Sequence, residues 1–147
     1  MIRISCIAIA VGLSMAAGAA AQTPATVFDM KGTWKGHNEA LVDGPATHHP
    51  PGVTARPAGK YRMREQDITY RFDGQEGRRF WGTMSSEQLA GVRMLGALSI
   101  DGKTIYMVSK EGHLDGQVID GDTIEMCYRH ATAESAVIGC NVMKRQK

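Results

Sequence analysis

The chain has 147 residues, of which 43% are hydrophobic and 22% charged, and its formal net charge is +2. This length and balance predict one globular domain with its own apolar core, and they exclude an intrinsically disordered chain. No block of like charge stands out, so we expect no nucleic-acid partner.

The first segment, residues 1–21, is typical of a secretory signal peptide. Arg3 supplies a short positive region, the run from Ile4 to Met15 is apolar and uncharged, and Ala19-Ala20-Ala21 offers small residues for cleavage. The run is too short for a good spanning helix, so we expect no stable membrane insertion. We therefore expect a periplasmic or secreted protein, cleaved near Ala21, whose single domain spans residues 22–147.

The rest of the chain has little helical periodicity and many short runs in which apolar and polar residues alternate. Asp-Gly pairs, which favour tight hairpin turns, recur among them. Strands are predicted at 29–36, 60–64, 68–72, 78–85, 96–100, 103–110, 113–120, 123–129 and 136–145. Eight or nine strands joined by short turns predict an all-β antiparallel meander, either a barrel or a sandwich. We favour a small barrel, because closure leaves no exposed edge.

Three stretches depart from this pattern. The alternation changes phase across residues 65–67, which predicts a bulge or a turn. Ser85 or Ser86 is placed to cap a short helix over "SSEQLAGVRM". Residues 43–59 hold four prolines and three glycines, so we expect a long loop there.

Two cysteines remain after cleavage, and an even number in an exported chain favours a disulfide. If Ala133-Glu134 is the centre of a hairpin turn, Cys127 falls opposite Cys140, which predicts a cross-strand bond. Glu125 and Arg129 share the face of Cys127, and we favour the solvent side for this pair.

The first strand carries "GTWKG", and a Gly-x-Trp there resembles the signature of the calycin superfamily, which includes lipocalins and avidins. In such barrels the tryptophan closes one end and a basic residue of the last strand packs over it. The resemblance implies this role for Gly32, Trp34 and Arg145 or Lys144. "GRRFWGTMSS", "DGKTIY" and "DTIEMCY" also resemble a group of uncharacterised exported α-proteobacterial proteins, which implies no activity.

Metal binding and catalysis both find little support. His48 and His49 are adjacent, so on an extended chain their side chains diverge, and no other ligand lies at a metal-binding spacing. The methionines form no M-x-M or M-x-x-M cluster, so we assign them to the core rather than to copper. There is no Gly-x-Ser-x-Gly motif. We therefore expect no metal, no cofactor and no catalytic residue.

The function that the sequence favours is non-enzymatic binding of a small, partly apolar molecule in the barrel mouth. Candidate ligand-binding residues are Trp34, Tyr61, Tyr70, Trp81 and Met107. The alternative is a protein-interaction module, such as a periplasmic enzyme inhibitor. It would present either the arm at residues 22–29 or the loop with His48, His49, Pro50 and Pro51 to a partner protein.

Overall fold

The alternating runs form nine β-strands in the part of the chain that the computed structural model describes, residues 26–44, 56–58 and 61–147. None of these residues is helical, so none lies in a helix that could span a bilayer. The strands are β1 (Gly32–Asp43), β2 (Arg56–Ala58), β3 (Tyr61–Glu76), β4 (Arg79–Ser86), β5 (Val92–Leu98), β6 (Thr104–Val108), β7 (His113–Asp120), β8 (Thr123–Ala131) and β9 (Ala136–Arg145).

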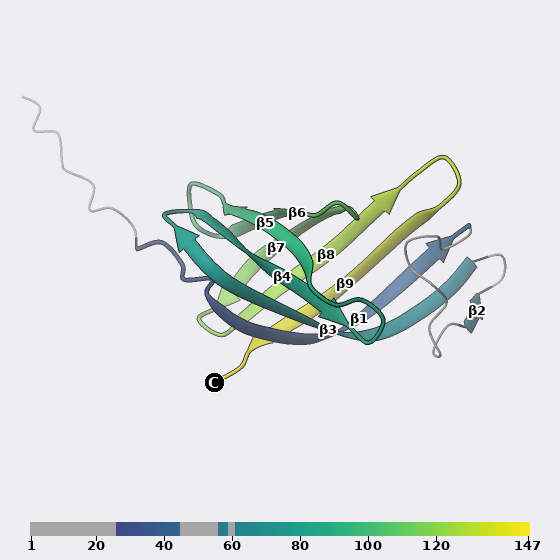
Figure 1. Cartoon of the computed structure of the whole chain (residues 1–147), viewed down its shortest axis with the longest axis horizontal. Helices are drawn as coiled ribbons and strands as arrows, with labels where there is room; N and C mark the ends of the chain where they lie inside the picture. Colours follow the sequence, from purple (N-terminus) through teal and green to yellow (C-terminus); the bar gives the residue numbers. More distant parts are fainter. Residues whose placement is uncertain (1–25, 45–55, 59–60) are drawn as a thin grey trace, which may run out of the picture.

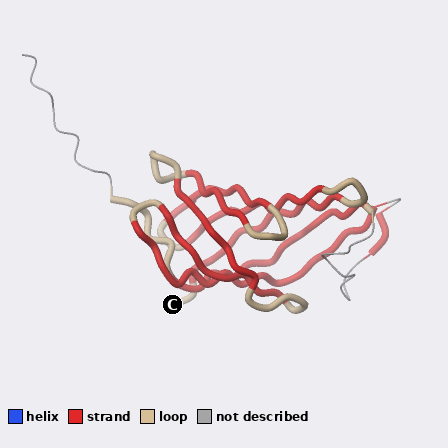
Figure 2. The backbone as a smooth tube through the Cα atoms, turned by 45° about the horizontal axis from the view of Figure 1, so that its top comes forward, coloured by secondary structure: helices blue, strands red, loops and turns tan. Residues whose placement is uncertain are grey.

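Eight of these strands close into an antiparallel barrel (Figures 1 and 2). From β3 to β9 each strand pairs with the next, and β1 closes the circle by pairing with both β9 and β3. The short strand β2 pairs with the beginning of β3, outside the circle. The all-β barrel predicted from the sequence is thus confirmed.

The barrel wall is taller on one side than on the other. Strands β3, β1, β9 and β8 have 16, 12, 10 and 9 residues, whereas β5 and β6 have 7 and 5. In Figure 1 the long strands extend past the others toward the end of the barrel where β2 lies. We call this the open end; the end where β1 begins and β9 finishes is the closed end.

The apolar core fills the barrel toward the closed end. Trp34, Ile105 and Ile124 are fully buried, and the rings of Phe72 and Phe80 meet edge to face with centroids 4.9 Å apart. Met126 and Met143 are also buried in this cluster. The methionines at these two positions are therefore core residues.

The segment predicted to be a helix is a hairpin connection, so that prediction was wrong. Strand β4 runs to Ser86 and β5 begins at Val92. The Ser85 and Ser86 hydroxyls, expected to cap a helix, accept hydrogen bonds from the N–H groups of Gly91 and Gln88. From Val92 onward the chain forms β5, which pairs with β4. This pairing outweighs the weak helix propensity of the segment.

The predicted irregularity at residues 65–67 is also absent. Strand β3 keeps one register with β1 from Arg62 to Phe72, and its bulge lies between Phe72 and Gly74 instead. Because side chains alternate along a strand, Arg64 and Gln66 share the inward face with Phe72, and Tyr61 does not. Tyr61, which the sequence had suggested as a ligand-binding residue, is therefore not on the inward face.

The predicted loop at 43–59 ends in the strand β2, and residues 45–55, which include His48, His49, Pro50 and Pro51, lie outside the described residues.

The predicted disulfide is confirmed. Cys127 and Cys140 are directly paired between β8 and β9, and their sulfur atoms are bonded. The hairpin turns between Ala131 and Ala136, as the position of the bond required. Glu125 and Arg129 are exposed, so this pair lies on the solvent side as predicted.

Candidate functional site at the open end of the barrel

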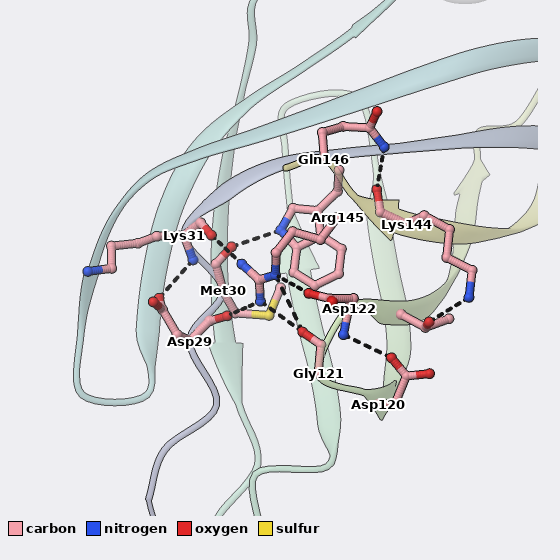
Figure 3. Close-up of polar contacts among 11 residues, drawn as sticks. Asp29, Met30, Lys31, Asp120, Gly121, Asp122, Lys144, Arg145 and Gln146 are labelled. Carbon is pink, nitrogen blue, oxygen red and sulfur yellow. Dashed lines mark hydrogen bonds and ion pairs between the residues drawn. The ribbon is translucent and has the colours of Figure 1, made fainter.

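The closed end is sealed by Trp34 and Arg145. Figure 3 shows Arg145 between the N-terminal arm at Asp29 and Lys31 and the turn at Gly121 and Asp122. The indole Nε1 donates a hydrogen bond of 2.9 Å to the Met30 carbonyl oxygen, and the guanidinium carbon lies 4.1 Å from the Trp34 ring centroid. The guanidinium also donates to the carbonyl oxygens of Asp29 and Lys31. A cation over an indole face is an attractive arrangement. The hydrogen bonds to Asp29, Met30 and Lys31 hold the N-terminal arm against the barrel.

The structure therefore brings together the residues that the calycin resemblance assigned to barrel closure. Gly32 also lies beside Arg145, since a Cβ on Gly32 would stand 3.5 Å from an Arg145 nitrogen. Lys144, the other basic residue considered, instead donates a 2.6 Å hydrogen bond to the Thr123 hydroxyl. Among the described residues, paired polar groups and packed rings close this end of the barrel.

A pocket enters the barrel from the open end. Its apolar walls are Ile68, Met84, Leu89, Met94 and Leu114, and its polar lining is Asn38, Gln66, Tyr70, Ser109, Glu111, Tyr128 and Asn141. The space between the lining atoms is ≈ 520 Å³ including the open mouth, but only ≈ 40 Å³ admits the centre of a water molecule. The second volume corresponds to about three water positions, so the enclosed part of the pocket is small.

Three amide side chains form one row across the floor of this pocket. Gln66 on β3 is directly paired with Asn38 on β1, and the register of β1 with β9 carries the same row to Asn141. Asn38 and Asn141 are both buried. The Asn141 Oδ1 atom has no hydrogen-bond partner among the described residues. A buried acceptor without a partner costs about 1–3 kcal/mol, so its presence in a pocket favours a role in binding.

Two tyrosines border the same pocket. The Tyr128 hydroxyl donates a 2.7 Å hydrogen bond to the Glu111 carbonyl oxygen, and burial together with the nearby Glu111 raises the pKa of Tyr128. Burial and the neighbouring Tyr128 likewise raise the pKa of Tyr70, whose ring stacks on Phe72. Both phenols are therefore neutral at physiological pH and serve as hydrogen-bonding groups rather than as charges.

A cation stands beside the amide row. Arg64 is 4% exposed, and its Nη2 donates to the Gln66 and Gln88 side-chain oxygens at 2.7 and 2.8 Å. Its Nε has no partner among the described residues. Burial, with a smaller contribution from Arg62, lowers the pKa of this guanidinium.

Of the five residues predicted to bind a ligand, the structure places one in the pocket lining, Tyr70. Trp34 closes the opposite end, and Met107 is buried in the core. Trp81 lies on the outer surface with 46% of its area exposed, its ring over Gly74. Tyr61 begins β3 on the face opposite to Arg64.

The polar residues of the pocket were missed because the prediction looked for aromatic and apolar side chains. A usable signal was present: Asn38 is four residues from Trp34, so on a regular strand both face the barrel interior. Asn141 and Met143 are likewise two residues apart on β9, so both face the barrel interior.

No metal site is evident in the parts of the chain that the structure describes, where no group of three or more His, Cys, Asp and Glu residues could hold an ion. His37 pairs with Asp67 on the outer wall at 2.8 Å.

Comparison with known proteins finds a likeness among solved structures. No family model and no curated protein matches the chain. Among solved structures, the S-type phycobiliprotein lyase CPES from Guillardia theta is similar at 8% identity, covering 80% of this chain and 89% of that chain, with a TM-score of 0.34. A likeness at this level carries no argument about activity, so the function has to be argued from the pocket itself.

Proposed function

We propose that this protein binds a small, partly apolar molecule in the pocket at the open end of its barrel, and that it does so without catalysing a reaction. The observation that carries the proposal is the buried Asn141 Oδ1, which has no hydrogen-bond partner among the described residues and lies in a pocket with both apolar walls and polar groups. Apolar walls with a few placed polar groups are typical of small-molecule sites.

The dimensions of the pocket limit the ligand to a small one. A volume of ≈ 40 Å³ for water centres is far below that of a site for a drug-sized molecule. Met84 and Met94 form part of the wall, and methionine side chains adapt easily to a new shape. A flat or short-chain molecule could therefore enter with rotations of these two side chains.

The chemistry of the lining supports binding rather than catalysis. The described residues of the pocket lining include no histidine and no cysteine, and the two cysteines of the barrel are bonded to each other. A nucleophile activated by an adjacent base would need such a pair or an equivalent one.

The proposal extends to export, on the basis of the signal-like segment at residues 1–21. Cell fractionation and N-terminal sequencing test it. We expect the protein in the periplasm or the medium with Gln22 as its first residue; a cytoplasmic protein that still begins at residue 1 would contradict export.

Binding is tested by native mass spectrometry of the purified protein, followed by NMR titration with a library of small molecules. We expect shifts at the pocket residues that disappear in Leu89→Trp, which fills the mouth from the β4–β5 connection. Leu95→Trp, on the exposed outer face of β5, is the matched control and should keep them. A protein with no bound molecule and no response at the pocket would refute the proposal.

A second function, docking of a partner protein, is favoured by an apolar row on the outer wall. Trp81, Leu95 and Val108 are paired across β4, β5 and β6, and all three are exposed, with exposed Tyr106 beside them. Contiguous exposed apolar residues often mark interaction sites. A pull-down from periplasmic extract should then recover a partner that the double variant Trp81→Ser, Leu95→Ser loses; no specific partner would count against docking.

A further inference from the structure

The cation at the pocket edge differs from four other arginines of the barrel. Arg71, Arg79, Arg129 and Arg145 each pair with an aspartate or a glutamate, and the side chains of Arg71, Arg79 and Arg129 are largely exposed. Arg64 is almost completely buried, and its partners are two neutral glutamine oxygens. The most buried of these five guanidinium groups is thus the one without a counter-ion.

The missing counter-ion cannot come from an acidic side chain in the undescribed segments. All fifteen aspartate and glutamate residues of the chain lie within the described ranges, and residues 1–25, 45–55 and 59–60 contain none. Among the described residues no carboxylate forms an ion pair with Arg64. A buried charge is normally paired, because removal from water costs several kcal/mol that an isolated ion cannot recover.

The strands beside Arg64 carry small residues at the paired positions. It is directly paired with Ala40 on β1, which is paired with Gly139 on β9, and Gly139 is paired with Tyr128 on β8. Along this inward-facing row no long side chain stands between Arg64 and Tyr128. Strand β4 has already ended opposite Ile68, so the guanidinium lies where the short wall of the barrel is missing.

Gln66 connects the pocket wall to Arg64. Gln66 lines the pocket and also binds Arg64, so the guanidinium is one hydrogen bond from the pocket wall. The amide nitrogens of Gln66 and Gln88 are attached to the same carbon atoms as the oxygens that hold Arg64. They therefore place N–H donors next to the guanidinium, which suits a planar acceptor with two oxygens.

We propose that the ligand of this pocket carries a carboxylate group and that Arg64 is its counter-ion. The inference rests on the proposed function, since it names the class of molecule that the same pocket binds. One guanidinium balances one negative charge, and Arg62, the next inward-facing cation on β3, already donates to the Gly44 carbonyl oxygen. A small organic acid with an apolar body would place its carboxylate at Arg64 and its body against Ile68 and Met94.

The experiment compares matched pairs of ligands on the purified protein. Butyrate and benzoate are titrated beside butyramide and benzamide, which have nearly the same shape but no charge. Inorganic phosphate is titrated as a further anion. We expect each acid to bind at least about tenfold more tightly than its amide, the range of a charge-assisted hydrogen bond. Arg64→Met should abolish this preference, whereas Arg71→Met, which removes an exposed cation from the outer face of the same strand, should preserve it.

Each outcome separates the two proposals. If acids and amides bind equally well, or if Arg64→Met keeps the preference, the pocket binds ligands but the carboxylate inference is wrong. If phosphate binds more tightly than either acid and depends on Arg64, the ligand is a phosphate compound and the inference is again wrong. If none of the probes shifts a pocket resonance, the proposed function fails and the inference fails with it.

Thermal unfolding distinguishes a binding role for Arg64 from a structural one. Removal of a buried charge without a counter-ion should leave the Tm of Arg64→Met unchanged or raise it. A fall in Tm of more than about 5 °C would assign Arg64 to the fold and overturn the inference.

Discussion

The arginines at the two ends of this barrel have opposite kinds of surroundings. At the closed end Arg145 lies over Trp34, donates to two carbonyl oxygens and pairs with Asp122 at 3.2 Å. At the open end Arg64 has two neutral acceptors and an Nε without a partner among the described residues. The guanidinium group at the closed end thus has a counter-ion and hydrogen-bond acceptors, whereas the one at the open end has acceptors but no counter-ion within the described ranges.

This difference indicates how stability and function are divided in the molecule. Groups whose interactions are complete at the closed end stabilise the fold and have nothing left to offer a ligand. Groups with incomplete interactions at the open end cost stability, and evolution tends to retain such groups where they serve binding or catalysis. Substitutions that lower the stability should therefore cluster at the closed end, and substitutions that alter binding at the open end.

The largest expected effect is that of Trp34→Ala at the closed end. It removes a completely buried indole, its hydrogen bond to Met30 and its contact with Arg145, which should destabilise the barrel by about 3–5 kcal/mol. Unfolding in urea measures this difference. Trp81→Ala, which removes the exposed tryptophan of the outer wall, is the control and should cost much less. Equal losses for the two variants would mean that the closed end is not the stable part of the barrel.

The next effect is that of Arg145→Met, which keeps the aliphatic stem but removes the cation. The variant loses the contact with the Trp34 ring and the hydrogen bonds to Asp29 and Lys31, so we expect a loss of about 2 kcal/mol. Arg79→Met removes an exposed arginine paired with Glu76 and should change the free energy of unfolding by less than about 0.5 kcal/mol. If Arg145→Met is as mild as this control, the N-terminal arm is not held by Arg145.

The closed end was also the part that the sequence predicted best, for a physical reason. Gly-x-Trp near the start of the first strand and a basic residue on the last are local features of this end. The disulfide, which lies farther toward the open end, followed from the hairpin between Cys127 and Cys140. Apolar residues in alternation indicate a buried face directly, so the strands could be located from hydrophobicity alone.

The open end could not be predicted in this way, because its inward face is polar. Between Tyr61 and Asp67 the residues that point into the barrel are Arg62, Arg64 and Gln66, and their polarity suggested the opposite face. The register of β3 with β1 decides the orientation, and that pairing joins residues distant in the sequence. Counting forward from Trp34 on β1 places Asn38 correctly, but nothing in the sequence shows that Asn141 has no partner.

A third variant, with a smaller expected effect, tests how much stability the polar groups of the open end cost. Asn141→Leu replaces a buried amide by an apolar side chain of similar size, so the acceptor without a partner is removed. We expect a stability equal to that of the wild type or higher by up to about 1 kcal/mol, together with weaker ligand binding. Thr123→Val is the matched variant at the closed end: its buried hydroxyl accepts from Lys144 Nζ, and its loss should cost about 1 kcal/mol. Changes of opposite sign in the free energy of unfolding would support the division between the two ends. A destabilised Asn141→Leu variant would contradict it.

The smallest effect belongs to the outer wall between the two ends, where His37 accepts or donates a 2.8 Å hydrogen bond with Asp67. This bond raises the pKa of His37 above its usual 6.5, so the folded protein binds the proton more tightly than the unfolded chain does. The stabilisation is therefore complete below pH 6.5 and is lost as the pH rises through the folded pKa.

Because the imidazole is 54% exposed, solvent screening limits that stabilisation to at most about 0.5 kcal/mol. NMR titration of the His37 ring should give a pKa above 6.5 that falls in Asp67→Asn and stays unchanged in Asp73→Asn, which neutralises the partner of Arg71. A His37 pKa that does not respond to Asp67→Asn would break the assignment of the shift to this contact. A large change in unfolding free energy across the same pH range would show that the outer wall contributes to stability as the closed end does.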